Sequence, residues 1–289
     1  MLWVAQEDRL AALTAFVRDA AALDPSVTHI TPQQALSLCP VLSTDYLAGA
    51  AIEPDAADID VHALHQGYLR GFRRRGGEVV TGARVLGLRR DGAAWEVTSA
   101  AGAWSAPVVV NAAGAWADEL ASLAGAAPIG LVPKRRTAIT FDPPSGADVK
   151  SWPFLMDVDE TFYFKPDAGR LLGSPADETP SPPCDAQPEE LDIAITVDRI
   201  ETATTMQIRR IVSRWAGLRS FVADKVPVVG FDPGAEGFFW LAGQGGYGIM
   251  TSPGLSALAA AQILGAPTPK DIEALGVMPS DLSPTRLTR

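Results

Sequence analysis

Two apolar stretches, each running into a glycine turn and then a helical pattern, limit the folds open to this chain. One is VVVNAAG at 108–114 and the other is FFWLAGQGGYGIMTSPG at 238–254. The continuous apolar run Val108-Val109-Val110 suits a strand that is buried on both faces of a parallel sheet, and the second stretch is interpreted as strand, glycine turn and helix. Both stretches therefore predict one α/β sheet, assembled from segments that lie far apart in the sequence.

The chain between these stretches has a different pattern. Short segments rich in β-branched and aromatic residues recur from 134 to 174, namely RTAITF, FLMDV, TFYFKP and RLLGS. Such segments, separated by turn residues, are typical of an antiparallel sheet. We therefore predict a mixed α/β and α+β fold with two interleaved domains, one formed by 56–125 and 219–289 and the other by 1–55 and 126–218.

Other elements follow from helical spacing, capping residues and turn residues. Helices are predicted at 7–22, 32–39, 61–75, 115–124 and 193–211, and short strands at 79–80, 85–88 and 95–98. The final residues, PSDLSPTRLTR, have neither pattern and are predicted to form a loose tail.

The charge balance argues against several partners. The chain has 24 Lys and Arg against 34 Asp and Glu, a net charge of −10, which opposes loose binding to nucleic acid or anionic membranes. No stretch has the roughly 18 uninterrupted apolar residues of a membrane span, and the first residues do not resemble a secretion signal. Cys39 and Cys184 are too few for a disulfide framework. We therefore expect a cytoplasmic protein.

The three histidines give no sign of a metal centre or a hydrolytic triad. His29, His62 and His65 lack the spacing to a nucleophile or to acidic and cysteine ligands that such sites need. His62 and His65 lie on one predicted helix and are interpreted as helix-surface residues. No metal site is predicted.

The stretch Gly243-Gln244-Gly245-Gly246-Tyr247-Gly248 satisfies G-x-G-x-x-G after a strand and before a helix whose start is marked by 251–253. The pattern alone is weak, because no second strand with an acidic end follows it. Backbone N–H groups at such a turn and at a helix N-terminus nevertheless attract negative charge. The alternative is a turn that merely lets strand and helix pack closely.

Five motifs in this order make the chain similar to a known family. They are VVVNAAGAWADELASLAG, KRRTAITF, TFYFKPDAGRLLGSP, WAGLRSFVADKVPVVG and FFWLAGQGGYGIMTSPG. Together they resemble the D-amino acid oxidase superfamily of flavoproteins, and within it the D-arginine dehydrogenases. The resemblance runs through essentially the whole chain and implies FAD as the cofactor, with 56–125 and 219–289 forming an incomplete Rossmann-like FAD-binding domain and the rest a substrate domain.

The resemblance implies that Arg136, Tyr163 and Arg219 bind the carboxylate of the substrate. A guanidinium can hold a carboxylate with two parallel hydrogen bonds, and a phenol can donate another. The residues alone leave other interpretations open: a surface charge for Arg136, a core aromatic for Tyr163 and a structural ion pair for Arg219.

Cofactor contacts are implied along the same motifs. Val85 and the Ala113-Gly114 turn match backbone contacts on the adenine and ribose side, with plain sheet packing as the alternative. The glycine turn matches the segment beside the flavin ring, where Ile249 is also expected to form an apolar wall of the substrate pocket. The flavin-side residues are Gly243, Gln244, Gly245, Gly246, Tyr247, Gly248, Ile249 and, less closely matched, Met250.

The chain departs from the family in one respect. Similar enzymes begin with a strand and a G-x-G-x-x-G helix that hold the pyrophosphate, then an acidic residue for the ribose, and nothing before Trp3 matches these. A lid segment over the substrate is also without a match. We therefore expect weaker flavin binding, and unpaired backbone groups and exposed apolar faces at 108–114.

The implied reaction is hydride transfer from the α-carbon of a D-amino acid to the flavin, giving an imino acid that water converts to a keto acid and ammonia. Two alternatives stay open: a glycine or sarcosine type amine oxidase, and an inactive fragment or accessory subunit that does not hold FAD alone. The electron acceptor, whether oxygen, a quinone or a dye, is not indicated by the sequence.

Overall fold

The computed structural model describes residues 1–287 and divides the chain into two compact units. Unit 1 comprises Met1–Asp58, Arg135–Thr179 and Asp185–Gly217, and unit 2 comprises Ile59–Lys134, Pro180–Cys184 and Leu218–Arg289. Each unit is therefore assembled from three segments that alternate along the chain. The mixed α/β fold with interleaved parts, predicted from the sequence, is confirmed.

The sheet that forms most of unit 1 runs in the order β12-β8-β11-β10-β9-β1-β3-β2, and β13 also pairs with β8. The ends of β8, β12 and β13 at 132–134, 180 and 218–221 belong to unit 2. Its strands are β1 (Leu2–Ala5), β2 (Thr28–Ile30), β3 (Gly49–Ile52), β8 (Val132–Phe141), β9 (Leu155–Asp157), β10 (Tyr163–Asp167), β11 (Arg170–Ser174), β12 (Thr179–Pro180) and β13 (Ile211–Phe221). The expected antiparallel strands β8, β10 and β11 are present, whereas β1 pairs with β9 in parallel.

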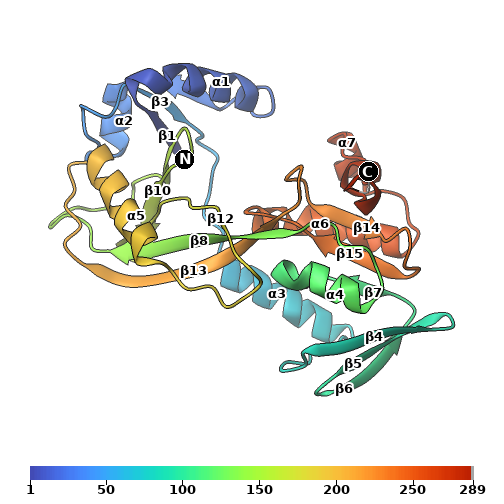
Figure 1. Ribbon diagram of the computed structural model, residues 1–289. Helices are drawn as coiled ribbons and strands as arrows, with labels where there is room; N and C mark the ends of the chain where they lie inside the picture. Colours follow the sequence, from blue (N-terminus) through green and yellow to red (C-terminus); the bar gives the residue numbers. More distant parts are fainter. Residues whose placement is uncertain (288–289) are drawn as a thin grey trace. The chain divides into compact units, whose positions relative to one another are not determined.

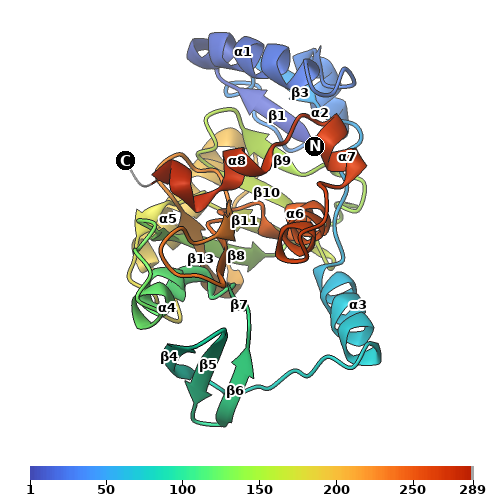
Figure 2. The same cartoon turned by 90° about the vertical axis from the view of Figure 1, so that its right-hand side faces the viewer.

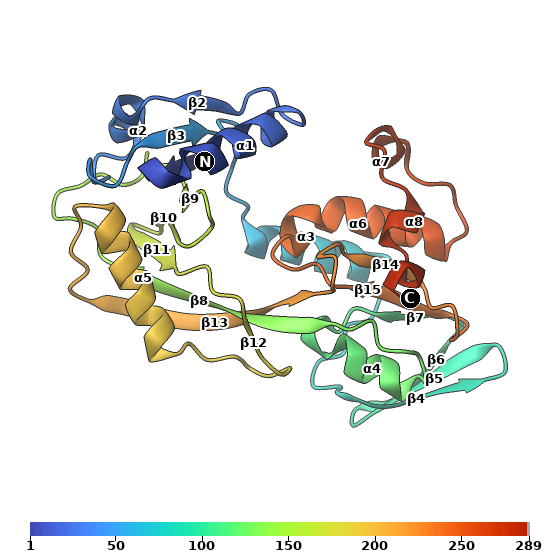
Figure 3. The ribbon, with the colours of Figure 1, turned by 45° about the horizontal axis from the view of Figure 1, so that its top comes forward.

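Three helices of unit 1 are α1 (Leu10–Ala21, after the 3-10 turn Glu7–Arg9), α2 (Pro32–Leu38) and α5 (Glu190–Ala203), and they flank this sheet (Figures 1 and 3). Helix α2 begins where the sequence predicted, because Thr31 and Gln34 form a reciprocal capping box. Helix α5 packs on β11, where a Cβ added at Gly173 would meet the end of Ile200 at 2.7 Å. The glycine therefore allows the helix to lie close to the sheet.

Unit 2 contains the predicted α/β sheet in the order β14-β15-β7, with strands β7 (Val109–Asn111), β14 (Val228–Phe231) and β15 (Phe238–Ala242). Strands β15 and β7 are parallel. The central strand is buried on both faces: Phe238 and Trp240 join one apolar cluster with α4 (Ala117–Leu123), and Phe239 joins another with α6 (Gly248–Ile263). One strand therefore anchors a helix on each side of the sheet.

Unit 2 also contains helix α3 (Val61–Arg74) and the 3-10 turn η2 (Gly114–Trp116). An antiparallel meander is formed by β4 (Val85–Asp91), β5 (Ala94–Ser99) and β6 (Gly102–Ala106). The C-terminal elements are α7 (Lys270–Ala274), α8 (Pro279–Leu282) and η3 (Pro284–Leu287). Figure 2 shows the meander as a separate sheet, with an extended segment leading to it from α3.

Four local predictions were wrong. Val79 and Val80 form no strand; both are exposed and have no sheet partner among residues 1–287. Helix α5 ends at Ala203, where Thr204 adopts an extended backbone, and the chain then enters β13. Helix α6 begins at Gly248 rather than at 251–253, so Pro253 lies inside it. The tail is largely ordered as α8 and η3, although its last two residues, 288–289, lie outside the described part of the chain.

Strand β7 is partly exposed. It pairs with β15 on one side and lies at the edge of its sheet within residues 1–287, and the side chain of Val110 is 41% exposed. Complete burial on both faces was therefore a wrong prediction for this strand, whereas the expected exposure of its apolar residues is confirmed. Within the same residues, no helix is both long enough and apolar enough to cross a membrane.

Candidate functional site

The two glycine turns predicted from the sequence lie at the same edge of the unit 2 sheet. Because β7 and β15 are parallel neighbours, the turns that follow them leave at the same end. The buried side chain of Asn111 shapes the first turn: its amide donates to the Ala117 carbonyl at 2.8 Å and its oxygen accepts from the Ala113 N–H at 3.3 Å. Gly114 completes this turn with φ +57°, a conformation that glycine adopts without strain.

The second turn connects β15 to the N-terminus of α6. Gly243 and Gly245 have φ of +71° and +56°, and the Gly245 N–H donates to the Ser220 carbonyl at 2.9 Å. The turn thereby lies against β13, where a Cβ at Gly246 would be 2.9 Å from a guanidinium nitrogen of Arg219. Gly243 and Gly245 are thus favoured by backbone conformation, and Gly245 also by the close approach of the Phe221 ring of β13.

Positive charge gathers beside this second turn. Besides Arg219, the ammonium groups of Lys134 and Lys225 lie 5.1 and 5.8 Å from the centre of the Phe221 ring, and that ring packs directly against Gly245. The N-terminal N–H groups of α6 add the positive end of a helix dipole. Together these groups favour a negatively charged or electron-rich ligand at the turn.

A cavity of about 270 Å³ lies where the two turns and the end of β13 meet, entirely within unit 2. It brings together seven of the residues predicted from the sequence: Gly114, Arg219, Gln244, Gly245, Gly246, Gly248 and Ile249. Three others do not line it: Gly243 is buried beneath the turn, and Tyr247 and Met250 are 57% and 60% exposed.

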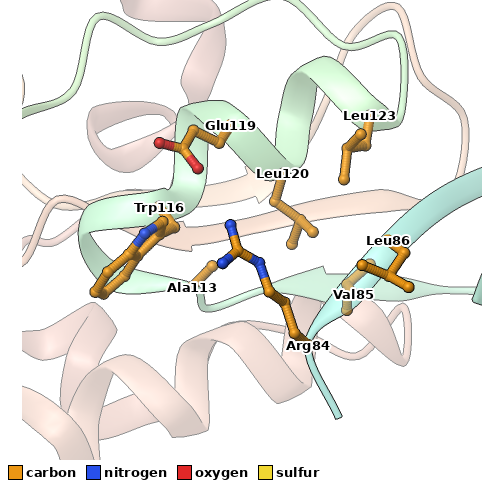
Figure 4. Close-up of a pocket in the computed structure, with 8 residues that line it drawn as sticks. All are labelled: Arg84, Val85, Leu86, Ala113, Trp116, Glu119, Leu120 and Leu123. Atoms are coloured by element: carbon orange, nitrogen blue, oxygen red, sulfur yellow. The ribbon is translucent and has the colours of Figure 1, made fainter. Parts of the chain in front are cut away.

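A second cavity of unit 2, of about 640 Å³, contains the remaining predicted cofactor residues, Val85 and Ala113 (Figure 4). Its walls are mostly apolar, with Leu120 among the residues that α4 contributes. Arg84 and Trp116 also line this cavity and were not predicted from the sequence. Trp116 stands two residues after Gly114, within η2 (Gly114–Trp116).

Arg136 and Tyr163 lie in unit 1, on the same face of its sheet. Gly173 lies opposite Ile139, and Tyr163 lies opposite Ser174. Since residues opposite one another share a face and successive residues alternate, Arg136 and Tyr163 both point away from the face to which Gly173 belongs. The Tyr163 ring is buried and stacks on Phe154, with ring centres 5.2 Å apart.

The Arg136 guanidinium already has protein partners. Its Nε donates to the Asp177 carbonyl at 2.9 Å, and an Nη lies 3.7 Å from a carboxylate oxygen of Glu178. A guanidinium has five N–H groups, so these contacts hold the side chain in place and leave donors for a ligand. The alternative interpretation of Arg136 as a surface charge was wrong, because its side chain is only 10% exposed, and carboxylate binding by its remaining donors stays a prediction.

The carboxylate of Asp177 fixes the segment that holds Arg136. It accepts from the backbone N–H of Thr137 at 2.6 Å, and the buried Arg135 side chain on the opposite face of β8 lies 3.8 Å from it. Burial raises the pKa of Asp177 above its usual value, and the hydrogen bond from Thr137 opposes that rise. These contacts hold Asp177, and with it the carbonyl that accepts from Arg136, beside β8.

The three predicted carboxylate ligands therefore belong to different units. Arg219 lies at the glycine turn of unit 2, and Arg136 and Tyr163 share a face in unit 1. Their convergence on one substrate group stays a prediction.

A family model described as "FAD dependent oxidoreductase" (DAO) matches residues 1–262. The chain belongs to the DAO family. The family assigns FAD as its cofactor, and the cluster of two glycine turns in unit 2 contains most of the residues that the sequence motifs predicted for cofactor contact.

Individual relatives are distant. The chain is 27% identical over 255 residues to "Uncharacterized oxidoreductase YurR" of Bacillus subtilis, covering 85% of this chain and 65% of that protein. It is 25% identical over 262 residues to mitochondrial dimethylglycine dehydrogenase of Mus musculus, covering 84% of this chain and 30% of that one. The chain thus spans less than two thirds of the length of both curated relatives.

The fold is shared with glycine oxidase from Geobacillus kaustophilus, with a TM-score of 0.79 and 22% identity, covering 92% of this chain and 71% of that chain. The family resemblance drawn from the sequence motifs is confirmed. The narrower resemblance to D-arginine dehydrogenases finds no support in these comparisons.

Proposed function

We propose that this chain takes part in the FAD-dependent oxidative deamination of D-amino acids, basic ones among them, giving an imino acid and then a keto acid and ammonia. The observation that carries the proposal is the position of Arg219, whose guanidinium lies against the glycine turn at the N-terminus of α6. A carboxylate held there would be fixed beside the residues proposed to contact the flavin.

The residues of unit 2 fit the two ends of FAD. The larger cavity, about 640 Å³ with mostly apolar walls, has the size and character of sites for drug-sized ligands, and we assign Val85, Ala113 and Gly114 to the adenine and ribose side. We assign the turn residues Gly243 to Met250 to the flavin side, where positive charge would stabilise the reduced ring. FAD, when bound, supplies the hydride acceptor for the substrate α-carbon.

The protein's own contribution is orientation and electrostatics. Arg219 would bind the substrate carboxylate, with Arg136 and Tyr163 as the further predicted contacts, and Ile249 would supply an apolar wall. A guanidinium suits this task because it stays charged at any working pH and holds both carboxylate oxygens at once. None of these side chains has to act as a strong base.

Replacing Arg219, the proposed carboxylate-binding residue, tests the proposal. In the holoenzyme, Arg219→Ala is expected to raise the KM for a D-amino acid about 10- to 100-fold, since a hydrogen bond to a charged group contributes about 1.5–3 kcal/mol. Flavin content, measured from the visible absorption of the purified protein, should be retained. Arg73→Ala, an exposed arginine of α3, is the matched control. Unchanged kinetics in Arg219→Ala would remove this residue from the site.

A substrate comparison separates the proposal from a glycine or sarcosine type oxidase. Dimethylglycine dehydrogenase and glycine oxidase among the relatives act on small amines according to their names, so this alternative is tested directly. Peroxide formation and dye reduction are measured with D-arginine, D-lysine, glycine and sarcosine. Turnover of the D-amino acids with dye supports the proposal, whereas faster turnover of glycine or sarcosine with peroxide formation replaces it.

The visible spectrum tests whether the chain holds the cofactor alone. The yellow flavin bands, retained after gel filtration of the chain mixed with FAD, support an active holoenzyme. A chain that stays colourless would favour an accessory subunit or an inactive fragment.

A further inference from the structure

Arg84 is an exposed arginine in the larger cavity of unit 2, immediately before β4. Figure 4 shows its guanidinium between the Trp116 ring and Leu120, among the residues that line the cavity. Within residues 1–287, its side chain takes part in no hydrogen bond or ion pair. A charged side chain that points into an apolar cavity without a partner is available to a ligand.

The charges of the cavity indicate which part of a ligand Arg84 would meet. The charged residues that line it are Arg84, from the β4 side, and Glu119, from α4. Their charges cancel, and a carboxylate in the same cavity repels phosphate groups. The apolar walls, formed by Leu86, Leu120 and others, favour a flat and uncharged group over a phosphate. An adenine ring has this character.

We propose that Arg84 is a cofactor-binding residue that stacks its guanidinium on the face of the adenine ring in this cavity. A guanidinium is planar, weakly hydrated and attracted to the faces of aromatic rings. It can cover such a ring without needing an acceptor atom from it. This inference rests on the proposed function only in taking the cavity as the adenine side of the FAD site.

The test compares adenosine, AMP and ADP by isothermal titration calorimetry with the full chain, at millimolar concentrations of each ligand. Stacking predicts that Arg84→Ala weakens binding of all three by the same factor, about 3- to 30-fold, the range expected for a cation over an aromatic ring.

Arg89→Ala is the matched control, since Arg89 is an exposed arginine of β4 that pairs with Glu96 outside this cavity. It should bind all three ligands as wild type does, and circular dichroism should show both variants folded. A loss confined to AMP and ADP would overturn the proposal by assigning Arg84 to phosphate. Unchanged binding in Arg84→Ala, or no adenosine binding by wild type, would also overturn it.

These outcomes are separate from those that test the proposed function. Amine oxidation plays no part in the adenosine measurements, so a chain that binds adenosine through Arg84 but oxidises no amine would contradict only the proposed function. A chain that oxidises D-amino acids while Arg84→Ala binds adenosine normally would contradict only this inference.

Discussion

Gly245 combines two constraints that no other residue type meets. Its φ of +56° is in the left-handed region, and a Cβ there would lie 2.4 Å from the Phe221 ring. Phe221 is the last residue of β13, and the ammonium groups of Lys134 and Lys225 lie over its ring. The turn can therefore approach β13 only where a side chain is absent.

We predict that Gly245→Ala destabilises the protein by about 2 kcal/mol or more, from left-handed strain and displacement of the ring. Gly254→Ala is the control: this glycine lies inside α6 with open space around it, and alanine there should stabilise by about 0.5–1 kcal/mol. Urea denaturation measures both. Equal stability of the two variants would contradict the geometry of the turn.

The two cysteines are predicted to differ sharply in reactivity. Cys39 is fully buried, and burial raises the pKa of its thiol to about 12, whereas Cys184 is exposed. Because the thiolate is the reactive form, Ellman's reagent at pH 8 should titrate Cys184 alone in the native protein and both thiols in guanidinium chloride. Rapid reaction of two thiols in native protein, or of Cys39 in a Cys184→Ser variant, would show that Cys39 is accessible.

At the scale of elements, an ion pair ties the C-terminal η3 to the turn before β14. The Arg286 guanidinium donates to both carboxylate oxygens of Asp224, at 2.8 and 3.2 Å, and also to the Val226 carbonyl. These hydrogen bonds lower the pKa of Asp224. A segment with little apolar pattern is thereby held against the sheet.

The lowered pKa of Asp224 gives the sign of its pH dependence. The unfolded state binds the proton more tightly, so this contribution to stability is complete above the unfolded pKa of about 3.9 and is lost as pH falls through the lower folded pKa. Asp224→Asn should lower Tm at pH 7. The loss in free energy of unfolding should be less than about 1 kcal/mol, because the pair is partly exposed. The difference from wild type should shrink towards pH 3.

Asp45→Asn, at another exposed position, should lower Tm less at pH 7. Thermal melts of the three proteins between pH 3 and pH 7 provide the comparison. A difference between wild type and Asp224→Asn that grows as pH falls would contradict the assigned role of the pair.

At the scale of the whole molecule, FAD binding should stabilise the folded chain. A ligand that binds only the folded state at 100 times its Kd contributes about 2.7 kcal/mol, which corresponds to a rise in Tm of roughly 5 °C. Riboflavin lacks the nucleotide half and should raise Tm less, since it leaves the larger cavity unused. A Tm that FAD leaves unchanged, followed by differential scanning fluorimetry, would contradict cofactor binding by this chain.

Much of the fold could be predicted because local patterns agree with it. The capping box at Thr31 and Gln34 and the apolar run of β15 each predicted the correct element. The errors have local causes as well. Val79 and Val80 have strand propensity but no partner strand within residues 1–287, and Thr204 ends α5 before the apolar pattern does.

The candidate site was predicted in part for a similar reason. The G-x-G-x-x-G pattern singled out Gly243 and Gly245, and the family resemblance implied Gly114; all three have positive φ in the structure. Arg84 was missed because its significance depends on the cavity into which it points, and no local pattern records that.

The sequence by itself determined which residues form turns, which cap helices and which apolar segments form strands, because those preferences belong to each residue and its near neighbours along the chain. Only the tertiary structure decided that the turns after β7 and β15 leave the same edge and that β13 brings Arg219 against one of them. Parallel pairing between segments so far apart depends on the packing of Phe238, Phe239 and Trp240 on both faces of one strand, and that packing exists only once the chain has folded.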